Sequence, residues 1–201
     1  DQNTKQRMQE GTKIGLLAQQ LFPQGVAIPI TDFKENLHLS SSLLNDKPLF
    51  EASFQINNLY ARTDILLPNH LIEVKSSTKP KEEHYYDLAF QKHILQLNNI
   101  EINKLSVIHL NKDYVKQGPL DIKELFTITD VTQEVAAIQD QIPKLIEQQL
   151  AIINQPQPLT PKIINQCTPY HDCPVHKALF KQLEQGSIFE LYNGKKKAIA
   201  L

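Results

Sequence analysis

The sequence predicts an α/β fold in which a mixed central sheet is flanked by helices. Three short extended runs follow one another between residues 49 and 76, with only tight turns between them, as in antiparallel sheets. A helical pattern over 81–97 then separates them from an apolar run over 105–110. A helix between two strands is typical of a crossover connection, so we expect parallel and antiparallel pairs in one sheet.

The first part of the chain alternates between helical and extended patterns. Apolar residues over 5–22 recur at helical spacing and predict an amphipathic helix, which Pro23-Gln24-Gly25 ends. Residues 26–30 predict a short strand. A second helix is expected from Thr31, a candidate N-cap, to Leu44.

The extended runs predict three consecutive antiparallel strands. Residues 49–56 and 59–67 flank Asn57-Asn58, and because Asn tolerates the positive φ of a tight turn, the two runs predict a β-hairpin. Pro68-Asn69-His70 predicts a second turn, before a third strand over 71–76.

The second half of the chain predicts two more helices and a buried strand. Residues 81–97 return to helical spacing, and 105–110 are apolar with little alternation, as in a buried strand. A further amphipathic helix is expected over 132–153, interrupted near Pro143, before a Pro- and Gln-rich connector over 154–161.

Length and composition limit the domain organisation and the location. The 201 residues suffice for one domain with a small addition, and we expect a core over 1–160 and a C-terminal appendage over 161–201. No stretch approaches the roughly 18 apolar residues of a membrane helix, and the polar N-terminal segment lacks the apolar core of a signal peptide. We therefore expect a cytoplasmic protein without membrane contact. Because a helical pattern starts soon after Asp1, further domains of a longer polypeptide are candidate partners.

The charge balance excludes a protein that binds nucleic acid through a globally basic surface. The net charge is −1 and the pI is near 6.7, so any contact with DNA must be local. Candidate DNA contacts are Arg62, Lys79 and Lys81. Lysines at 195–197 form a second basic group. For both groups, the alternative to a DNA contact is that the lysines are ordinary solvated surface residues.

The segment from Ala61 to Lys75 carries the most informative chemistry. It places Asp64 on one predicted strand and Glu73 and Lys75 on the next. Because alternate side chains of a strand share a face, Glu73 and Lys75 point the same way and Val74 points into the core. The tight turn brings Asp64 beside them.

Two carboxylates at one point favour a divalent cation, which relieves their repulsion. Mg²⁺ accepts one or two carboxylates and completes its shell with waters and phosphate oxygens. It would lower the pKa of a bound water and polarise a phosphate, while Lys75 would orient that water or neutralise developing charge. These groups suit phosphodiester hydrolysis. The alternative is a surface hairpin whose Glu–Lys pair contributes less than about 1 kcal/mol.

The pattern resembles the RecB-like branch of the PD-(D/E)XK nucleases, which includes the exonucleases of CRISPR adaptation. Its signature runs from a metal-binding Asp through Glu-x-Lys to a helix that bears Gln, and Asp64, Glu73-Val74-Lys75 and Gln91 match it. The resemblance implies a restriction-endonuclease-like αβββαβ core and a catalytic group of Asp64, Glu73, Lys75 and Gln91. It also implies Mg²⁺ or Mn²⁺ as the cofactor, with Asp64, Glu73 and Val74 at the metal.

A closer resemblance is to the N-terminal nuclease domain of an uncharacterised bacterial family, in which a second, exonuclease-like domain follows. The similar segments cover most of the chain and lie at 11–25, 50–54, 64–78, 87–91, 109–114 and 167–174. Together the resemblances imply a nuclease that hydrolyses DNA, as single strands or at duplex ends, in repair, recombination or defence.

Two departures from the RecB-like pattern leave other functions open. Residues 11–15 contain no His to serve as a further metal ligand, and Glu51 is the candidate acid in its place, unless it is an ordinary solvent-facing strand residue. Leu95 stands where a Tyr follows the Gln of the family. The alternatives are a catalytically degenerate nuclease fold that binds DNA and a protein-interaction module.

Cys167 and Cys173 lie close together in the expected appendage. Without an export signal, free thiols or metal ligation fit better than a structural disulfide. Relatives with an iron–sulfur cluster use four cysteines, whereas this chain has two and carries Leu179 where a third would fall. We therefore expect no iron–sulfur cluster, and leave open a degenerate Cys-Cys-His site with His176 or two ordinary thiols.

Overall fold

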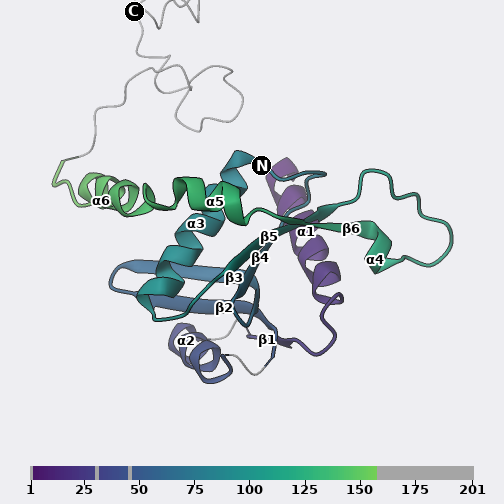
Figure 1. Ribbon diagram of the computed structural model, residues 1–201, viewed down its shortest axis with the longest axis horizontal. Helices are drawn as coiled ribbons and strands as arrows, with labels where there is room; N and C mark the ends of the chain where they lie inside the picture. Colours follow the sequence, from purple (N-terminus) through teal and green to yellow (C-terminus); the bar gives the residue numbers. More distant parts are fainter. Residues whose placement is uncertain (1, 30–31, 45–46, 158–201) are drawn as a thin grey trace, which may run out of the picture. The chain divides into compact units, whose positions relative to one another are not determined.

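The first compact unit of the chain is an α/β structure built on a mixed six-stranded sheet (Figure 1). A computed structural model describes residues 2–29, 32–44 and 47–157. The chain divides into two units, Asp1–Gln148 and Gln149–Leu201. The predicted α/β class, with helices flanking a mixed sheet, is confirmed. The expected appendage over 161–201, with both cysteines, lies outside the described residues.

The sheet has the strand order β1-β2-β3-β4-β5-β6. In chain order the elements are α1 (Gln2–Gln19), β1 (Val26–Ala27), α2 (Phe33–Ser42), β2 (Leu49–Ile56), β3 (Leu59–Leu67), β4 (His70–Val74), α3 (Glu82–Leu97), β5 (Lys104–Leu110), α4 (Ile122–Leu125), β6 (Phe126–Asp130), α5 (Thr132–Gln139) and α6 (Ile142–Ile153).

Strands β2, β3 and β4 form the predicted antiparallel series. Asn57, with a φ of 51°, lies in the turn between β2 and β3, and Asn69, with a φ of 58°, lies in the turn between β3 and β4. Both turns use Asn in the left-handed region, where its short polar side chain is tolerated better than most. The predicted hairpin is therefore confirmed.

The two parallel pairs of the sheet each enclose a helix. β4 pairs with β5 across α3, and β1 pairs with β2 across α2. Such connections are needed because parallel neighbours cannot be joined by a tight turn. Strand β6, which the sequence analysis did not predict, pairs antiparallel to β5 at the edge, and only Phe126 of this strand is buried.

The structure corrects one expected helix boundary and confirms another. Asp32, rather than Thr31, is the N-cap of α2, because its carboxylate accepts hydrogen bonds from the amides of Lys34 and Glu35. The expected helix over 132–153 consists of α5 and α6. Pro143 is the second residue of α6, where a helix needs no amide donor, so the predicted interruption near Pro143 is confirmed.

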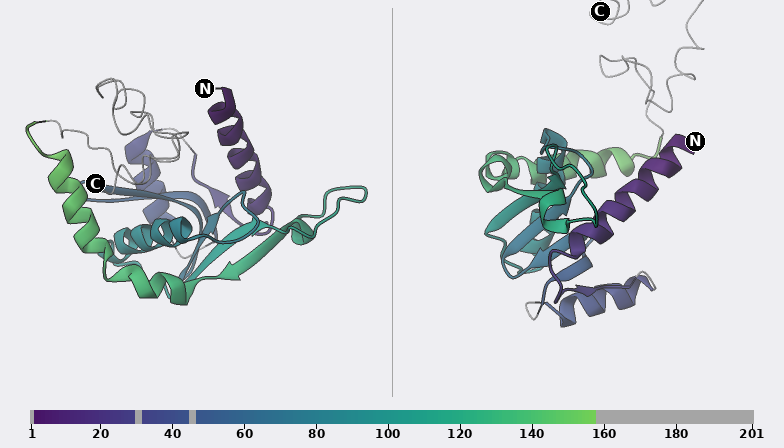
Figure 2. Two further views of the ribbon diagram at one scale, coloured as in Figure 1. Left: turned by 90° about the horizontal axis from the view of Figure 1, so that it is seen from above. Right: turned by 90° about the vertical axis from the view of Figure 1, so that its right-hand side faces the viewer.

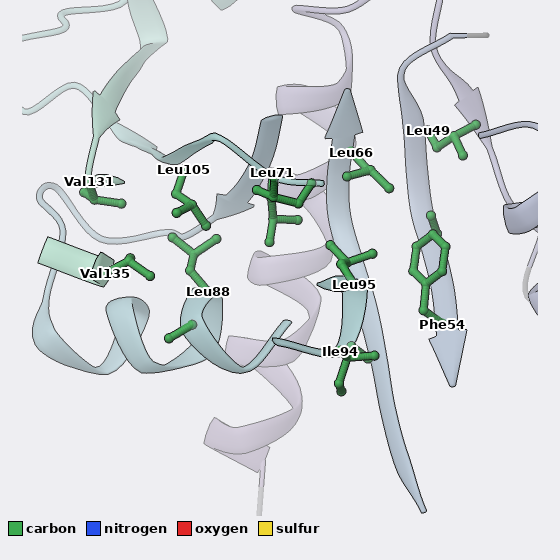
Figure 3. Packing of buried hydrophobic residues seen from close by; sticks show 14 of the residues in the cluster. Leu49, Phe54, Leu66, Leu71, Leu88, Ile94, Leu95, Leu105, Val131 and Val135 are labelled. Atoms are coloured by element: carbon green, nitrogen blue, oxygen red, sulfur yellow. The ribbon is translucent and has the colours of Figure 1, made fainter. Parts of the chain in front are cut away.

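Each face of the sheet has its own apolar core. On one face, side chains of α3 pack against four strands and α5 (Figure 3). On the opposite face lies α1 (Figure 2). Its core consists of Ala18, Phe50, Ile65, Ile72, Ile108 and Phe126. Strands β3 and β4 therefore lie between α3 on one face of the sheet and α1 on the other.

Candidate functional site

A cavity of about 660 Å³ opens between α1, β1 and the strands β2, β3 and β4. Helix α1 and strand β1 supply mainly small, apolar and amide side chains to its wall. The charged side chains in its wall are Glu51, Arg62, Asp64, Glu73 and Lys75. With Val74, six predicted site residues therefore line one space.

Asp64 lies against the backbone of the neighbouring strand. Its Oδ2 accepts a hydrogen bond from the amide of Val74 at 2.6 Å. Burial raises the pKa of Asp64 from 3.8 to about 7, and the charges of Glu73 and Glu51 add to the rise against the opposing effects of the Val74 amide and Lys75. Asp64 is thus a carboxylate whose negative charge the surrounding protein does not fully compensate.

Glu73 is a buried carboxylate with a partner on each oxygen. Its relative exposure is 7%. Oε1 lies 2.8 Å from the Lys75 ammonium, and Oε2 accepts a hydrogen bond from Gln91 Nε2 at 2.7 Å. Glu73 and Lys75 share the face of β4 that meets α3, as predicted, while Val74 packs on the opposite face. Gln91 Oε1 is buried without a hydrogen-bond partner.

Lys75 is held between two carboxylates. Its ammonium donates to Asp87 Oδ2 at 2.8 Å as well as contacting Glu73. Burial alone would lower the pKa of Lys75, but the charges and hydrogen bonds of Glu73 and Asp87 outweigh burial and raise it. Lys75 therefore remains protonated through the neutral and mildly alkaline range.

Glu51 occupies an irregular point of β2. The pairs Phe50–Ile65 and Ala52–Thr63 bracket Glu51 and place it opposite Asp64. Its φ is 59°, in the left-handed region. Core packing changes face at this point, because Phe50 belongs to the core under α1 whereas Ala52 belongs to the core under α3. The distortion allows Glu51 to line the cavity together with Asp64.

Two predicted DNA-contacting lysines lie away from this space. Lys79 and Lys81 are exposed between β4 and α3, and neither is among the residues that line the cavity. Lys81 is the N-cap residue of α3 and forms an exposed ion pair with Glu83 at 3.4 Å. Cys167 and Cys173 lie outside the described residues.

Helix α1 forms one wall of the cavity with Gly11, Thr12, Gly15, Leu16 and Gln19. A Cβ added at Gly11 or Gly15 would meet nothing within 4 Å, so both positions border open space. Residues 5–13 of α1 are exposed, whereas Ala18 is fully buried against the sheet. As the sequence indicates, no His of α1 reaches the site.

The residues present fit a small divalent cation with few protein ligands. Among the described residues, no group of three or more His, Cys, Asp or Glu side chains is arranged to hold a metal ion. Mg²⁺ needs only one or two carboxylates, with waters in its remaining positions. Asp64 and Glu73 provide two carboxylates at one cavity, and desolvation and the charge of Glu73 raise the pKa of Asp64.

The sequence analysis missed the role of Asp87. It lies four residues before Gln91 on α3, so both side chains face β4. The spacing of four residues between Asp87 and Gln91 was the sequence signal that could have identified Asp87 as a site residue. The role of α1 as a cavity wall was missed as well, because no sequence pattern indicates which residues a helix presents to an open space.

Comparisons with family models, with curated proteins and with solved structures found no match to this chain. The resemblance to RecB-like nucleases therefore stays a prediction. In the described part of the chain, no helix combines the length and the apolar character that a membrane span needs. The function must be argued from the geometry of the cavity.

Proposed function

We propose that this chain is a divalent-metal-dependent nuclease that hydrolyses phosphodiester bonds of DNA. One observation carries the proposal: half-buried Asp64 and buried Glu73 line one cavity beside Lys75, and desolvation together with the charge of Glu73 raises the pKa of Asp64 to about 7. A carboxylate whose pKa is raised by a neighbouring carboxylate is also suited to share a divalent cation with that neighbour.

In this proposal each residue has a separate task. Asp64 and Glu73 hold Mg²⁺ or Mn²⁺, with Glu51 as a further acid on the cavity wall. The bound ion supplies a Lewis acid and lowers the pKa of its water. Lys75, kept protonated by its two carboxylates, offsets the negative charge that develops on the phosphate. Gln91 fixes the orientation of Glu73.

The size and charge of the cavity also support a nucleic-acid substrate. Its volume of about 660 Å³ lies within the usual range of ligand sites, about 300–1,000 Å³. With a net charge of −1, contact with DNA must be concentrated at a few cations, and Lys75 and Arg62 are the cations in the wall. Repair, recombination or defence is the setting that we propose from the sequence resemblance.

Cleavage of linear double-stranded and single-stranded DNA tests this function. The assays compare Mg²⁺, Mn²⁺ and EDTA for wild type, Glu73→Ala and Lys75→Ala. Glu134→Ala on α5 and Lys112→Ala are matched controls, because both residues are exposed and neither lines the cavity. We expect the site variants to lose at least about 100-fold in rate and the controls to retain it. Cleavage that both site variants preserve would contradict the assignment.

A second candidate is a catalytically inactive nuclease fold that binds DNA or a protein. One observation favours it, namely that the described residues contain no group of three metal-binding side chains. Calorimetric titration with Mn²⁺ separates the candidates. The active enzyme should bind Mn²⁺ and lose that binding in Asp64→Asn, whereas DNA binding without Mn²⁺ binding or cleavage would favour the second candidate.

A further inference from the structure

Arg62 lines the cavity from β3 but has no part in the hydrolytic group described above. Its Nε lies 2.8 Å from Glu51 Oε2, and the two side chains are 24% and 36% exposed. The contact is an ion pair without hydrogen-bond geometry, because Nε and Nη2 are both buried and have no hydrogen-bond partner. A buried donor without an acceptor costs about 1–3 kcal/mol, and more when it is charged. The guanidinium therefore lacks acceptors that a ligand could provide.

The backbone at Glu51 is strained. A φ of 59° in a residue other than Gly costs about 1–3 kcal/mol, and such strain persists where the surroundings enforce it, often at functional sites. Regular pairing continues on both sides of this residue. The strain places the acid that pairs with Arg62 directly opposite Asp64.

Of the two cations that line the cavity, Arg62 is the one whose donors lack a hydrogen-bond acceptor. Lys75 already contacts Glu73 and Asp87, each at 2.8 Å. The guanidinium of Arg62 presents a planar set of donors that matches two oxygens of a phosphate at once, which an ammonium cannot do. A single phosphate group carries two oxygens that can accept hydrogen bonds from Nε and Nη2 at once.

We propose that Arg62 is the phosphate-binding residue of the cavity. Its guanidinium exchanges the contact with Glu51 for a two-point contact with a phosphate group of the substrate strand. This inference rests on the proposed function, because it takes the phosphate to belong to the nucleic acid that is cut beside Asp64 and Glu73. Arg62 thus fixes the position of the strand relative to the two carboxylates.

The arginine content of the chain allows a direct test. Arg7 and Arg62 are its only arginines, so the Nε–Hε region of a ¹H–¹⁵N spectrum contains one signal from each. Arg7 lies exposed on α1 and serves as the internal control. The signal that is missing from Arg62→Lys assigns Arg62. Titrations with inorganic phosphate and with a single-stranded oligonucleotide are made in EDTA, which prevents metal-dependent cleavage.

We expect both ligands to shift the Arg62 signal and to leave the Arg7 signal in place. The proposal is overturned if backbone amides of the cavity shift with the oligonucleotide while the Arg62 signal stays. Equal shifts of both arginines would also overturn it, because they would report non-specific attraction. Absence of any Arg62 shift with either ligand leads to the same conclusion.

Affinity measurements by fluorescence anisotropy give an independent readout. Arg62→Gln should weaken oligonucleotide binding about tenfold and reduce the slope of log K against log salt by about 0.7. Arg62→Lys should restore the slope but not the affinity, because lysine keeps the charge and loses the planar donor set. If Arg62→Gln does not fold, Glu51→Gln provides the test instead, because it removes the charge that pairs with Arg62. That variant should bind several-fold more tightly than wild type or Glu83→Gln, and unchanged or weaker binding overturns the proposal.

The two proposals fail in different ways. If the oligonucleotide shifts Arg62 but no metal-dependent cleavage occurs, the nuclease activity is wrong and the phosphate site stands. If cleavage occurs and Arg62→Gln leaves the affinity and the salt slope unchanged, the phosphate site alone is wrong. If only inorganic phosphate shifts Arg62, the anion site stands and DNA is excluded as its ligand.

Discussion

Gln91 donates a hydrogen bond from Nε2 to Glu73 Oε2 at 2.7 Å and thereby joins α3 to the end of β4. One helical turn earlier, Asp87 accepts from Lys75 at 2.8 Å. Positions four apart share a helix face and positions two apart share a strand face, so the two contacts agree on one register of α3 against β4. The carboxylate and the ammonium are therefore held in fixed relative positions.

Removal of the Gln91 amide should weaken the site more than the fold. In Gln91→Leu, Glu73 Oε2 loses its donor, and partners of this kind typically contribute 10- to 100-fold to metal affinity or activity. We expect Mn²⁺ affinity and the cleavage rate to fall by about tenfold, as measured by calorimetry and by a DNA cleavage assay. The free energy of unfolding should fall by only about 1 kcal/mol, because the cost of leaving the buried Glu73 Oε2 without its donor is partly offset by removal of Gln91 Oε1, which is already buried without a partner.

Gln139 provides the matched control for Gln91. It also has a buried Oε1 without a partner, and its Nε2 donates to the carbonyl of Ala89, away from the cavity. Gln139→Leu should leave Mn²⁺ affinity and cleavage unchanged. An equal loss in both variants would assign the effect to α3 packing rather than to Glu73.

Neutralising Asp64 should stabilise the metal-free protein at alkaline pH. The folded-state pKa is raised from 3.8 to about 7, so the folded state holds its proton more tightly than the unfolded chain does. The contribution of Asp64 to stability therefore falls as pH rises between these two values, and the full penalty applies above pH 7. We expect Asp64→Asn to be more stable than wild type by about 1–2 kcal/mol near pH 8 in EDTA.

Urea unfolding of wild type and Asp64→Asn at two pH values checks this sign. Near pH 4 the two proteins should differ little, because the carboxyl is then largely protonated in the folded state. Addition of Mn²⁺ near pH 8 should stabilise wild type and not the variant. A variant that is less stable than wild type near pH 8 would show that the ionised carboxylate of Asp64 does not destabilise the folded protein.

Removal of the Lys75 charge should destabilise the fold through Glu73. In Lys75→Met the carboxylate of Glu73, only 7% exposed, loses its nearest counter-charge. Because Lys75 itself is partly exposed, we expect a loss of about 2 kcal/mol in the free energy of unfolding. Glu73→Gln in the same background should recover part of the loss, since a neutral amide needs no counter-charge.

A double-mutant cycle of Lys75→Met and Glu73→Gln by urea unfolding measures this coupling. Lys81→Met is the control, because the Lys81–Glu83 pair is largely exposed and should contribute little. Additive effects of the two site substitutions would mean that Lys75 and Glu73 do not interact in solution.

Gly25 should not tolerate even a methyl group. A Cβ at this position would overlap the ring of Phe50, which is 6% exposed and belongs to the core under α1. The ring can yield only by disturbing that core, so Gly25→Ala should cost about 1–3 kcal/mol. Thermal unfolding measures the cost, with Gly11→Ala as a control that meets open space. Equal stability of Gly25→Ala and wild type would contradict the packing at Phe50.

The local part of this structure follows from the sequence. The Asn turns, the strand period of two and the helical spacing of 81–97 together predict the antiparallel series and the helix that crosses to β5. The same period of two places Glu73 and Lys75 on one face. These features depend on neighbours within a few residues, which sequence patterns describe well.

The features that depend on packing could not be predicted. Glu51 has no local signal for a positive φ, because the distortion arises where core packing changes from one face of the sheet to the other. Asp87 meets Lys75 only once α3 is placed on β4. Strand β6 buries only Phe126, so its sequence carries too little apolar pattern to identify a strand.

The one-sided attachment of α1 bears on access to the cavity. Its residues 5–13 are exposed, and the helix is fixed to the sheet mainly near Ala18. Gly11 lies in this exposed stretch and Gly15 just after it, and each lowers helical stability by about 1 kcal/mol relative to alanine. Fraying from that end therefore costs less than global unfolding, and local opening of α1 would uncover the cavity wall without disturbing the sheet.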